Sequence, residues 1–407
     1  MNKIKYIFFG MLWAINLLAQ DTITLNLCHE LAITNYPLTR QQNLLTDANG
    51  LSVMALNKNY LPQMILNGQA SYQSDVTKVP IQDIPVFGIE PLSKDWYKIV
   101  LDVNQVIYDG SITNRQKDLQ ETELEISRQE LEVELYNLKE RINKIYFSIL
   151  LLKENRRILQ LHESTLKSKL KTVESGVENG TVLESNADIL KAEIIKIEQS
   201  LAELDISRKT AISILNVFTG LELNGNTNFL VPEITIDIET YVNNRPEYSL
   251  FSLQQNKLEA SKKLINSRNL PQLMAFGQAG YGRPGYDMLK NQFDDFYMIG
   301  ARLRWNFWDW NKSHKEKEVL DIKKQIIETR KETFDKNIRI DLENKRAEIR
   351  KTEEMISRDR QIIELREKIS KSASSQLDNN VITSTEYLTE LNEESKARFD
   401  MEAQKIL

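Results

Sequence analysis

Two stretches of the chain repeat one another: NYPLTRQQNLLTDANGLSVMALNKNYLPQMILNGQASY at residues 35–72 and NRPEYSLFSLQQNKLEASKKLINSRNLPQLMAFGQAGY at residues 244–281. They align without a gap at an offset of 209 residues, and 12 of the 38 positions are identical. Further along, Ile107-Tyr108-Asp109 matches Phe307-Trp308-Asp309 at an offset of 200. The chain is therefore predicted to contain a first structural repeat at residues 21–220, a linker at 221–243 and a second repeat at 244–407.

Each repeat carries two segments in which apolar and polar residues alternate, about 61–74 and 95–108 in the first and about 271–282 and 295–308 in the second. Strict alternation is typical of a β-strand with one apolar face. Segments of this length can cross a bilayer as tilted strands, and the aromatic residues at their ends are typical of interfacial girdles. A soluble amphipathic sheet is the competing interpretation. It is weakened because the flanking helices offer the sheet no compact apolar partner.

The alternation divides the strand residues between two faces. The polar face, predicted to line a lumen, comprises Gln63, Asn67, Gln69, Asp102, Asn104, Arg302 and Arg304. The apolar face, predicted to meet lipid, comprises Met64, Leu66, Tyr97, Ile99, Leu101, Ile299 and Leu303. The smallest closed barrels use about eight strands, so four strands facing lipid would require an oligomer.

The rest of the chain is predicted to be helical. The sequence has only 14 Gly and 9 Pro, and residues 111–175, 181–219 and 301–407 contain neither. Apolar residues recur every seven positions from Leu124 to Val173, which is typical of a coiled coil. We expect long helices at 111–177 and 311–377, each about 100 Å long, and return helices at 182–219 and 383–407. The last helix is about ten residues shorter than its first-repeat counterpart, which leaves open whether the chain is truncated or the helix ends early.

Other features bound the function. Residues 1–20 have the basic start and apolar core of a secretory signal peptide, with a single N-terminal anchor helix as the alternative. Cys28 is the only cysteine, and the three histidines lie far apart, so we expect no metal, no cofactor and no catalytic site. A net charge of -5 gives no reason to expect nucleic acid as a partner.

The duplicated unit resembles the TolC-like outer membrane efflux proteins, also called the outer-membrane factor family. The motifs that carry this resemblance are the Asn-x-Pro helix, the Leu-Pro-x strand start, the Tyr-Asp-Gly or Trp-Asp-Trp strand end and the very long helix that follows. It implies an α+β membrane protein that assembles as a homotrimer, with a 12-stranded barrel in the outer membrane and an α-helical coiled-coil barrel in the periplasm. It also implies a passive export channel that docks a periplasmic adaptor and an inner-membrane efflux pump or ABC transporter.

The resemblance assigns roles to residues near the helix turns. Glu386 falls on the first of two acidic positions that narrow the channel entrance in the family, and Thr389 falls on the second, so one ring of charge is missing. Asp188 is the first-repeat equivalent of Glu386. The alternative is that Glu386 merely helps to start a helix. The turn residues that match the adaptor-docking tips are Gly176, Val177, Gly180, Leu377, Asn379 and Asn380.

Two functions from other classes remain open on the sequence. One is a secreted coiled-coil structural or adaptor protein with a small soluble β-domain, and the other is a periplasmic binding module. Recovery in the soluble periplasm without detergent would exclude the channel. The sequence does not identify the exported cargo.

Overall fold

The computed structural model describes residues 22–76, 92–232, 244–288 and 290–406. The predicted signal peptide, residues 77–91 between the two predicted strands of the first repeat, and part of the predicted linker at 221–243 lie outside the described residues. The chain divides into two compact units, one formed by residues 40–133 and 244–336 and the other by the remaining segments. These units are interleaved in the sequence. They therefore do not coincide with the two repeats, because each repeat contributes to both.

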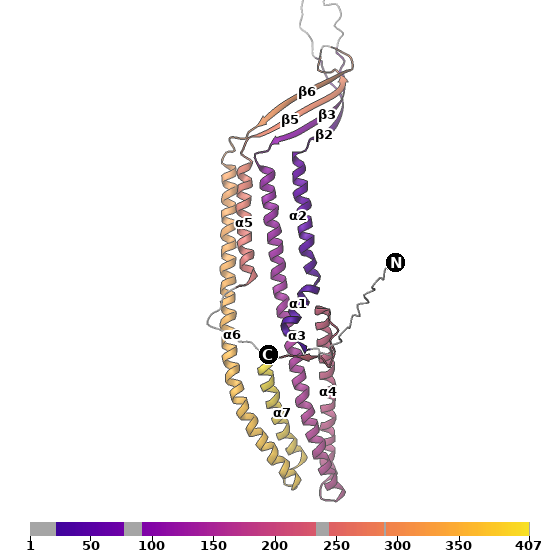
Figure 1. The fold of residues 1–407 in the computed structure, drawn as a ribbon, viewed down its shortest axis with the longest axis vertical. Coiled ribbons are helices and arrows are strands. Elements are labelled where there is room, and N and C mark those ends of the chain that lie inside the picture. The colour runs from indigo at the N-terminus through magenta and orange to yellow at the C-terminus, as the bar shows by residue number, and fades with distance from the viewer. Residues whose placement is uncertain (1–21, 77–91, 233–243, 289, 407) are drawn as a thin grey trace, which may run out of the picture. The chain divides into compact units, whose positions relative to one another are not determined.

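The first unit contains a four-stranded antiparallel sheet (Figure 1). Its strands are β2 (Gln63–Tyr72), β3 (Asp95–Tyr108), β5 (Gln272–Arg283) and β6 (Asp294–Arg304), paired in the order β2-β3-β5-β6. Each repeat therefore contributes one hairpin, and the β3–β5 pairing joins the repeats. The last strand is shorter than the predicted 295–308. Arg304 pairs with Gln272, the first residue of β5, and the preceding Pro271 has no N–H with which to extend the ladder.

Four helical segments belong to the same unit: α2 (Gln41–Asn57), α5 (Pro246–Ser267), and the first parts of α3 (Ile112–Glu178) and α6 (Lys312–Asp378). The short 3₁₀ helices η1 (Pro37–Arg40) and η2 (Lys58–Tyr60) flank α2. Polar contacts hold neighbours together. Arg128 of α3 donates to Thr46 of α2 at 2.8 Å, and Lys257 of α5 pairs with Glu123 of α3 at 2.9 Å. The ring of Phe334 on α6 packs edge-on against Tyr248 and Phe251 of α5.

Both long helices begin in the same way. Asp109 accepts a hydrogen bond from the backbone N–H of Thr113 at 2.7 Å, and Asp309 accepts one from Ser313 at 2.9 Å. The two residues after each aspartate adopt the left-handed conformation, including Trp310 with a φ of 55°. That conformation is costly for a bulky side chain, so the sharp strand-to-helix turn is held by its aspartate cap. The structure thus repeats this junction at an offset of 200 residues.

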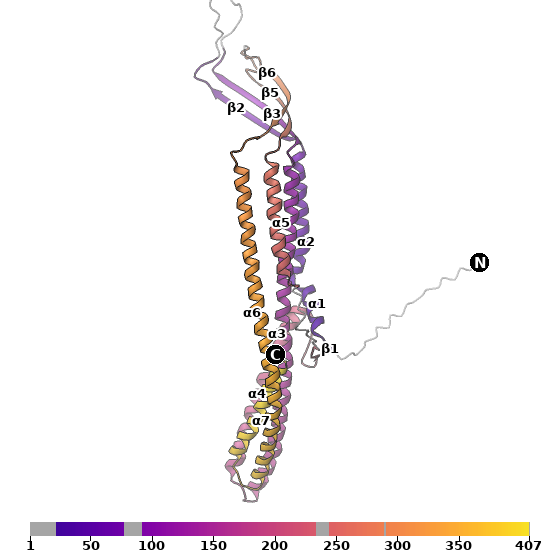
Figure 2. The same ribbon diagram turned by 90° about the vertical axis from the view of Figure 1, so that its left-hand side faces the viewer.

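The second unit contains α1 (Leu25–Asn35), α4 (Glu184–Thr219), α7 (Ser384–Ile406) and the remaining parts of α3 and α6. It also contains two short strands, β1 (Thr22–Ile23) and β4 (Asn228–Phe229), which pair in parallel beside α3 (Figure 2). The sequence predicted only a linker at the position of β4. The buried phenol of Tyr146 on α3 explains why these strands are fixed there, because its Oη lies 2.7 Å from the carbonyl oxygens of both Ile23 and Leu230.

The heptad pattern of α3 predicts only part of the buried face. Leu131, Leu138, Leu166 and Val173 are buried at heptad positions. Between them the buried face moves to a second series of apolar residues, four positions after the heptad positions, in which Ile142 and Ile149 are completely buried. A helix of 3.6 residues per turn drifts relative to a seven-residue repeat, so a different series faces the neighbouring elements there. No helix within the described residues is both long enough and apolar enough to span a membrane.

Candidate functional site

The sheet register places all seven predicted lumen residues on one face. Gln63 pairs with Asn104, and Arg304 pairs with Gln272 on the same side of the sheet. Directly paired residues share a face, and every second residue along a strand returns to it. Following the pairs across β2, β3, β5 and β6 therefore brings Gln63, Asn67, Gln69, Asp102, Asn104, Arg302 and Arg304 to one face.

Asp102 is the centre of a hydrogen-bond network on this polar face. It accepts a hydrogen bond from Asn67 of β2 at 2.6 Å and another from Gln278 of β5 at 2.5 Å. Tyr286 in turn donates to Gln278 at 3.2 Å. Gln278 is the second-repeat counterpart of Gln69, and its partnership with Asp102 was not predicted. The network links three strands through side chains as well as through the backbone.

The two arginines of the polar face are not neutralised by nearby carboxylates. The guanidinium of Arg302 lies over the ring of Phe276 at 5.1 Å, which is a cation–π contact. Neither Arg302 nor Arg304 forms an ion pair with any residue that the structure describes. The end of the sheet next to α3 and α6 is therefore positively charged on its polar face.

The opposite face is apolar and open. Leu66 is 70% exposed, Ile299 is 81% exposed and Leu303 is 67% exposed. The same register places all seven predicted lipid-facing residues here, since Met64 pairs with Val103 and Leu66 with Leu101. A continuous apolar face of this kind is unusual for a soluble monomer and marks a surface that is covered by lipid or by another protein.

The predicted docking tips are two turns with the same backbone geometry. In the first, Gly180 has a φ of 70°, its N–H bonds to the carbonyl of Val177 at 2.9 Å, and the N–H of Thr181 bonds to Gly176 at 2.9 Å. In the second, Asn380 occupies the left-handed position, and the matching bonds reach Leu377 and Gln376. This pair of bonds defines a Schellman helix end, for which Gly and Asn are the preferred residues.

The side chains at these turns differ in what they can contact. Gly180 and Asn380 are exposed at the turn, and the side chains of Asn179 and Asn379 bond back to the carbonyls of Ser175 and Ser375. Packing explains the glycine at position 176, because a Cβ there would lie 2.6 Å from the side chain of Val182. Leu377 is 5% exposed and faces the interior of the unit. Its side chain is therefore not available at the surface of the chain, although a direct contact with an adaptor at the docking tip would require this.

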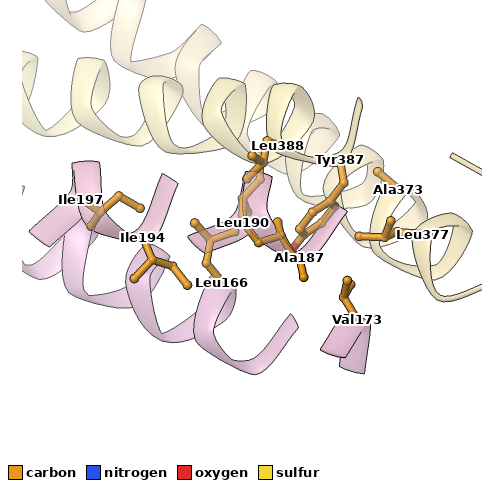
Figure 3. Close-up of a cluster of buried hydrophobic side chains, with 11 residues drawn as sticks. Leu166, Val173, Ala187, Leu190, Ile194, Ile197, Ala373, Leu377, Tyr387 and Leu388 are labelled. Carbon is orange, nitrogen blue, oxygen red and sulfur yellow. The ribbon is translucent and has the colours of Figure 1, made fainter. Parts of the chain in front are cut away.

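Four helices pack together beside the turns. Figure 3 shows the apolar cluster, in which α3, α4, α6 and α7 interdigitate. Its buried members are Leu166, Val173, Ala187, Leu190, Ile194, Ile197, Ala373, Leu377, Tyr387, Leu388 and Leu391. Burial raises the pKa of the Tyr387 phenol to about 12, so the ring stays neutral in this setting. The α3–α4 and α6–α7 hairpins are therefore joined by a shared apolar core near their ends.

Glu386 forms a capping box at the start of α7. Its carboxylate accepts hydrogen bonds from the backbone N–H of Thr383 at 2.7 Å and from the Thr383 hydroxyl at 3.0 Å, and its own N–H donates back to that hydroxyl at 3.3 Å. The backbone and side-chain bonds from Thr383 lower the pKa of Glu386. Its side chain is exposed. Glu386 thus starts a helix, as the alternative interpretation proposed, while its charge still faces solvent.

The other two predicted entrance residues, Thr389 and Asp188, are exposed. The structure does not align Asp188 with Glu386. Thr389 donates to the carbonyl of Thr385 at 3.0 Å, within its own helix. The equivalent hydrogen bonds of the two turns lie 200 residues apart. This offset aligns Glu386 with Asn186, whereas the sequence comparison aligned it with Asp188. Asn186 has its own role, since its Oδ1 accepts from the N–H of Ser384 at 3.0 Å at the start of α7.

A second polar feature of this unit was not predicted. The side chain of His162 on α3 is 6% exposed, and its Nδ1 lies 3.0 Å from the hydroxyl of Ser395 on α7. Its Nε2 is buried without a partner among the described residues. Burial lowers the pKa of His162, which is partly opposed by the charges of Glu193 and Glu394. A lone histidine within a coiled-coil heptad gives no sequence signal that would reveal this contact.

Comparison with known proteins gives matches at the level of structure. No family model and no curated protein sequence matches the chain. The outer membrane protein VceC from Vibrio cholerae matches with a TM-score of 0.67 and 12% identity, over 94% of this chain and 92% of VceC. The Campylobacter jejuni CmeC outer membrane channel matches with a TM-score of 0.61 and 15% identity, over 94% of this chain and 82% of CmeC.

A third solved structure, the open state of the Neisseria gonorrhoeae MtrE outer membrane channel, matches with a TM-score of 0.58 and 12% identity. That alignment covers 94% of this chain and 85% of MtrE. The similarity thus extends over nearly the whole chain, including both hairpins of the sheet and both long helices. The chain has the fold of the outer-membrane channel proteins.

Proposed function

We propose that the chain is a TolC-like outer membrane efflux protein that forms a homotrimeric export channel in the outer membrane. The observation that carries this proposal is the four-stranded sheet, which exposes large apolar side chains on one face and gathers Asp102, Arg302 and Arg304 on the other. Edge strands with unpaired backbone groups are not stable in a lipid environment, so β2 and β6 need partners. Three copies would supply 12 strands, enough to close a barrel around a polar lumen.

In this proposal the helices form a coiled-coil barrel that extends into the periplasm. The seven residues of the polar sheet face, which include Gln63 and Arg304, line the lumen. The turns around Gly180 and Asn380 dock a periplasmic adaptor, with the exposed asparagines rather than Leu377 at the contact. The inner-membrane efflux pump or ABC transporter supplies the energy, and the channel itself is a passive conduit of an efflux or type I secretion system. The function is not enzymatic.

Two neighbouring residues of β6 test the orientation of the sheet. Ile299 is on the apolar face, and Met298 is on the polar face. A lysine near the middle of a lipid-facing strand costs about 2–4 kcal/mol, whereas a lumen-facing lysine is tolerated. Ile299→Lys should therefore reduce the amount of trimer recovered from outer membranes by detergent, and Met298→Lys should not. Equal recovery of the two variants, or recovery of the wild-type chain in the soluble periplasm, would contradict the proposal.

Conductance provides a second test. The purified trimer, reconstituted in a planar bilayer, should conduct ions through the lumen. A trimer that stays closed under every condition, including variants that loosen the turns, would favour the alternative of a coiled-coil structural or adaptor protein. Mass measurement of the detergent complex distinguishes three copies from other oligomers.

A further inference from the structure

A pocket beside α4 is lined mainly by cations. It has a volume of about 240 Å³ and lies between α3, α4 and the turn that follows α4. Its lining residues are Arg156, Asp205, Arg208, Lys209, Gly225 and Asn226. Three of these carry a positive charge and one carries a negative charge, so the pocket has a net charge of about +2 at neutral pH.

The guanidinium groups of Arg156 and Arg208 are each held in place by one hydrogen bond. The Nε of Arg156 donates to Asp205 at 2.6 Å, and the Nη1 of Arg208 donates to the carbonyl of Gly225 at 2.7 Å. A guanidinium has five N–H donors, so most donors of each group remain available. The Nε of Arg208 is buried without a partner among the described residues. The two groups are therefore fixed in position and have unused donors.

The wall of the pocket is built independently of any ligand. The side chain of Asn216 on α4 donates to the carbonyl of Leu223 at 2.9 Å and accepts from its N–H at 3.0 Å. The N–H of Thr227 then closes a turn onto the carbonyl of Asn224 at 3.1 Å. These bonds hold the turn that carries Gly225 against the helix. A ligand would enter a preformed site, which lowers the entropy cost of binding.

We propose that this pocket binds an oxyanion, with phosphate or the phosphodiester of a lipid headgroup as the chemical class, through Arg156 and Arg208. Planar guanidinium groups bind phosphate oxygens by paired hydrogen bonds, and Lys209 adds a charge at the exposed side. Burial lowers the pKa of the Arg208 side chain, the neighbouring charge of Arg156 lowers it further, and the charge of Asp205 partly opposes both effects. A bound anion would offset this repulsion and satisfy the unused donors. The site does not depend on the proposed channel activity.

Thermal unfolding of the full-length protein in a neutral detergent tests this proposal. Sodium phosphate is titrated at constant ionic strength against sodium chloride, and the unfolding temperature is followed. A ligand that binds only the folded state raises the apparent stability in a saturable manner. We expect phosphate, but not chloride, to raise the unfolding temperature of the wild-type protein. Arg208→Gln should weaken the apparent affinity for phosphate at least tenfold.

Arg157→Gln is the matched control, because this neighbouring arginine pairs with Glu154 at 2.7 Å and does not line the pocket. It should retain the wild-type response. If Arg208→Gln does not fold, Lys209→Gln provides a second variant at an exposed position. Its affinity for phosphate should be about threefold weaker than that of the wild-type protein. Equal responses in the wild-type protein, the Arg208 or Lys209 variant and the control would overturn the proposal, as would an equal effect of chloride.

The source of the anion is separated by a second titration. Short-chain phosphatidylglycerol, below its micelle-forming concentration, is compared with inorganic phosphate on the wild-type protein and on Arg208→Gln. Tighter binding of the lipid that is lost in the variant would assign a headgroup site. Equal or tighter binding of phosphate would assign a free oxyanion, and an absence of both responses would overturn the proposal.

Discussion

Lys169 of α3 lies with its Nζ 2.8 Å from both carboxylate oxygens of Asp378, the last residue of α6. The same ammonium is 3.3 Å from the carbonyl of Ser374 and lies over the ring of Tyr387 at 5.7 Å. The lysine side chain is 11% exposed, while the aspartate is 41% exposed. One cation thus neutralises a carboxylate and also the carbonyl end of a helix, where positive charge is favoured. It links the two helical hairpins beside their turns.

We expect Lys169→Met to loosen this end of the α6–α7 hairpin. The methionine keeps most of the apolar stem but leaves Asp378 and the helix end without their cation. Because Asp378 is partly exposed, we expect a coupling of only about 1 kcal/mol in a double-mutant cycle with Asp378→Asn. Amide hydrogen exchange of residues 374–383 in the single and double variants measures the free energy of opening from which this coupling is obtained. Lys171→Met, at an exposed position of the same helix, should leave the exchange unchanged, and additive effects of the two Lys169–Asp378 substitutions would contradict the link.

Glu386 has two separable properties, its hydrogen bonds and its charge. Glu386→Gln keeps a side chain that can complete the capping box, whereas Glu386→Ala loses it at a cost of about 1 kcal/mol. Both variants lose the charge. If an acidic ring narrows the channel entrance, both should weaken block by multivalent cations in planar bilayers, but only Glu386→Ala should also lower the stability of the start of α7.

The pattern of these two measurements decides the role of Glu386. Unchanged cation block in Glu386→Gln, together with weaker block in Glu386→Ala, would assign the effect to helix capping. Unchanged block in both variants would remove the proposed ring. Thr389 is uncharged and exposed on α7, so Thr389→Ala provides a control that alters a neighbouring side chain without removing a charge.

His162 predicts a loss of stability in mild acid. Its pKa is lowered by burial below the ordinary value of about 6.5, so the unfolded chain binds the proton more readily than the folded chain does. The stability that the neutral ring contributes is complete above pH 6.5 and decreases as the pH falls towards the folded pKa. Glu193 of α4 and Glu394 of α7 favour the charged form and limit this loss, while Lys371 and Arg398 also line the surrounding pocket.

Urea unfolding at pH 7.5 and pH 5.5 checks this prediction. We expect His162→Asn to reduce the difference in the free energy of unfolding between the two pH values, whatever its effect on the stability common to both. His314→Asn is the matched control, because His314 is exposed and lies 3.0 Å from Glu318. That variant should keep the acid-induced loss. The same loss in wild type and His162→Asn would show that other groups cause it.

Arg302 and Arg304 predict the ion preference of the proposed channel. These two arginines, with no carboxylate partner among the described residues, would concentrate anions at their end of the lumen. We expect the wild-type channel to favour chloride over potassium. The double substitution Arg302→Gln and Arg304→Gln should lower the chloride-to-potassium permeability ratio about twofold or more.

The reversal potential in a potassium chloride gradient measures this ratio. Asp102→Asn, on the same face, should shift it in the opposite direction and thereby separates a charge effect from a general change of the lumen. A reversal potential that is the same in all three proteins would show that these residues do not face the ion path.

The strands and long helices could be predicted because their signals are local. Alternation in β3 predicted a strand at 95–108, where the structure has Asp95–Tyr108, and the absence of Gly and Pro predicted the long helices to within one residue. The division of the sheet residues between two faces is a consequence of the two-residue period, so it could be read before the register was known. The length of the last strand, β6, was overestimated because Pro271 ends the neighbouring strand β5 and leaves residues 305–308 without a pairing partner there.

The side-chain contacts between distant helices could not be predicted. Lys169 and Asp378 are one lysine and one aspartate among many charged residues on helices, and only their packing brings them together. His162 and Ser395 are separated by 233 positions in the sequence. The strand β4 has only two residues, which is too short for periodicity to reveal, and it depends on Tyr146 from another helix. The burial of Leu377 likewise depends on the approach of α7.

The pairing of β3 with β5 has a consequence for the origin of such chains. It is the only strand pairing in this sheet that connects the two repeats, and the two hairpins are otherwise complete within their own halves. A chain half as long, with one hairpin, would offer the same kind of edge on each side. Six such half-chains would supply as many strands as three of the present chain. In the proposed trimer, joining two such halves by one linker would turn a sixfold ring into a threefold ring and would allow equivalent positions, such as Gly180 and Asn380, to carry different residues.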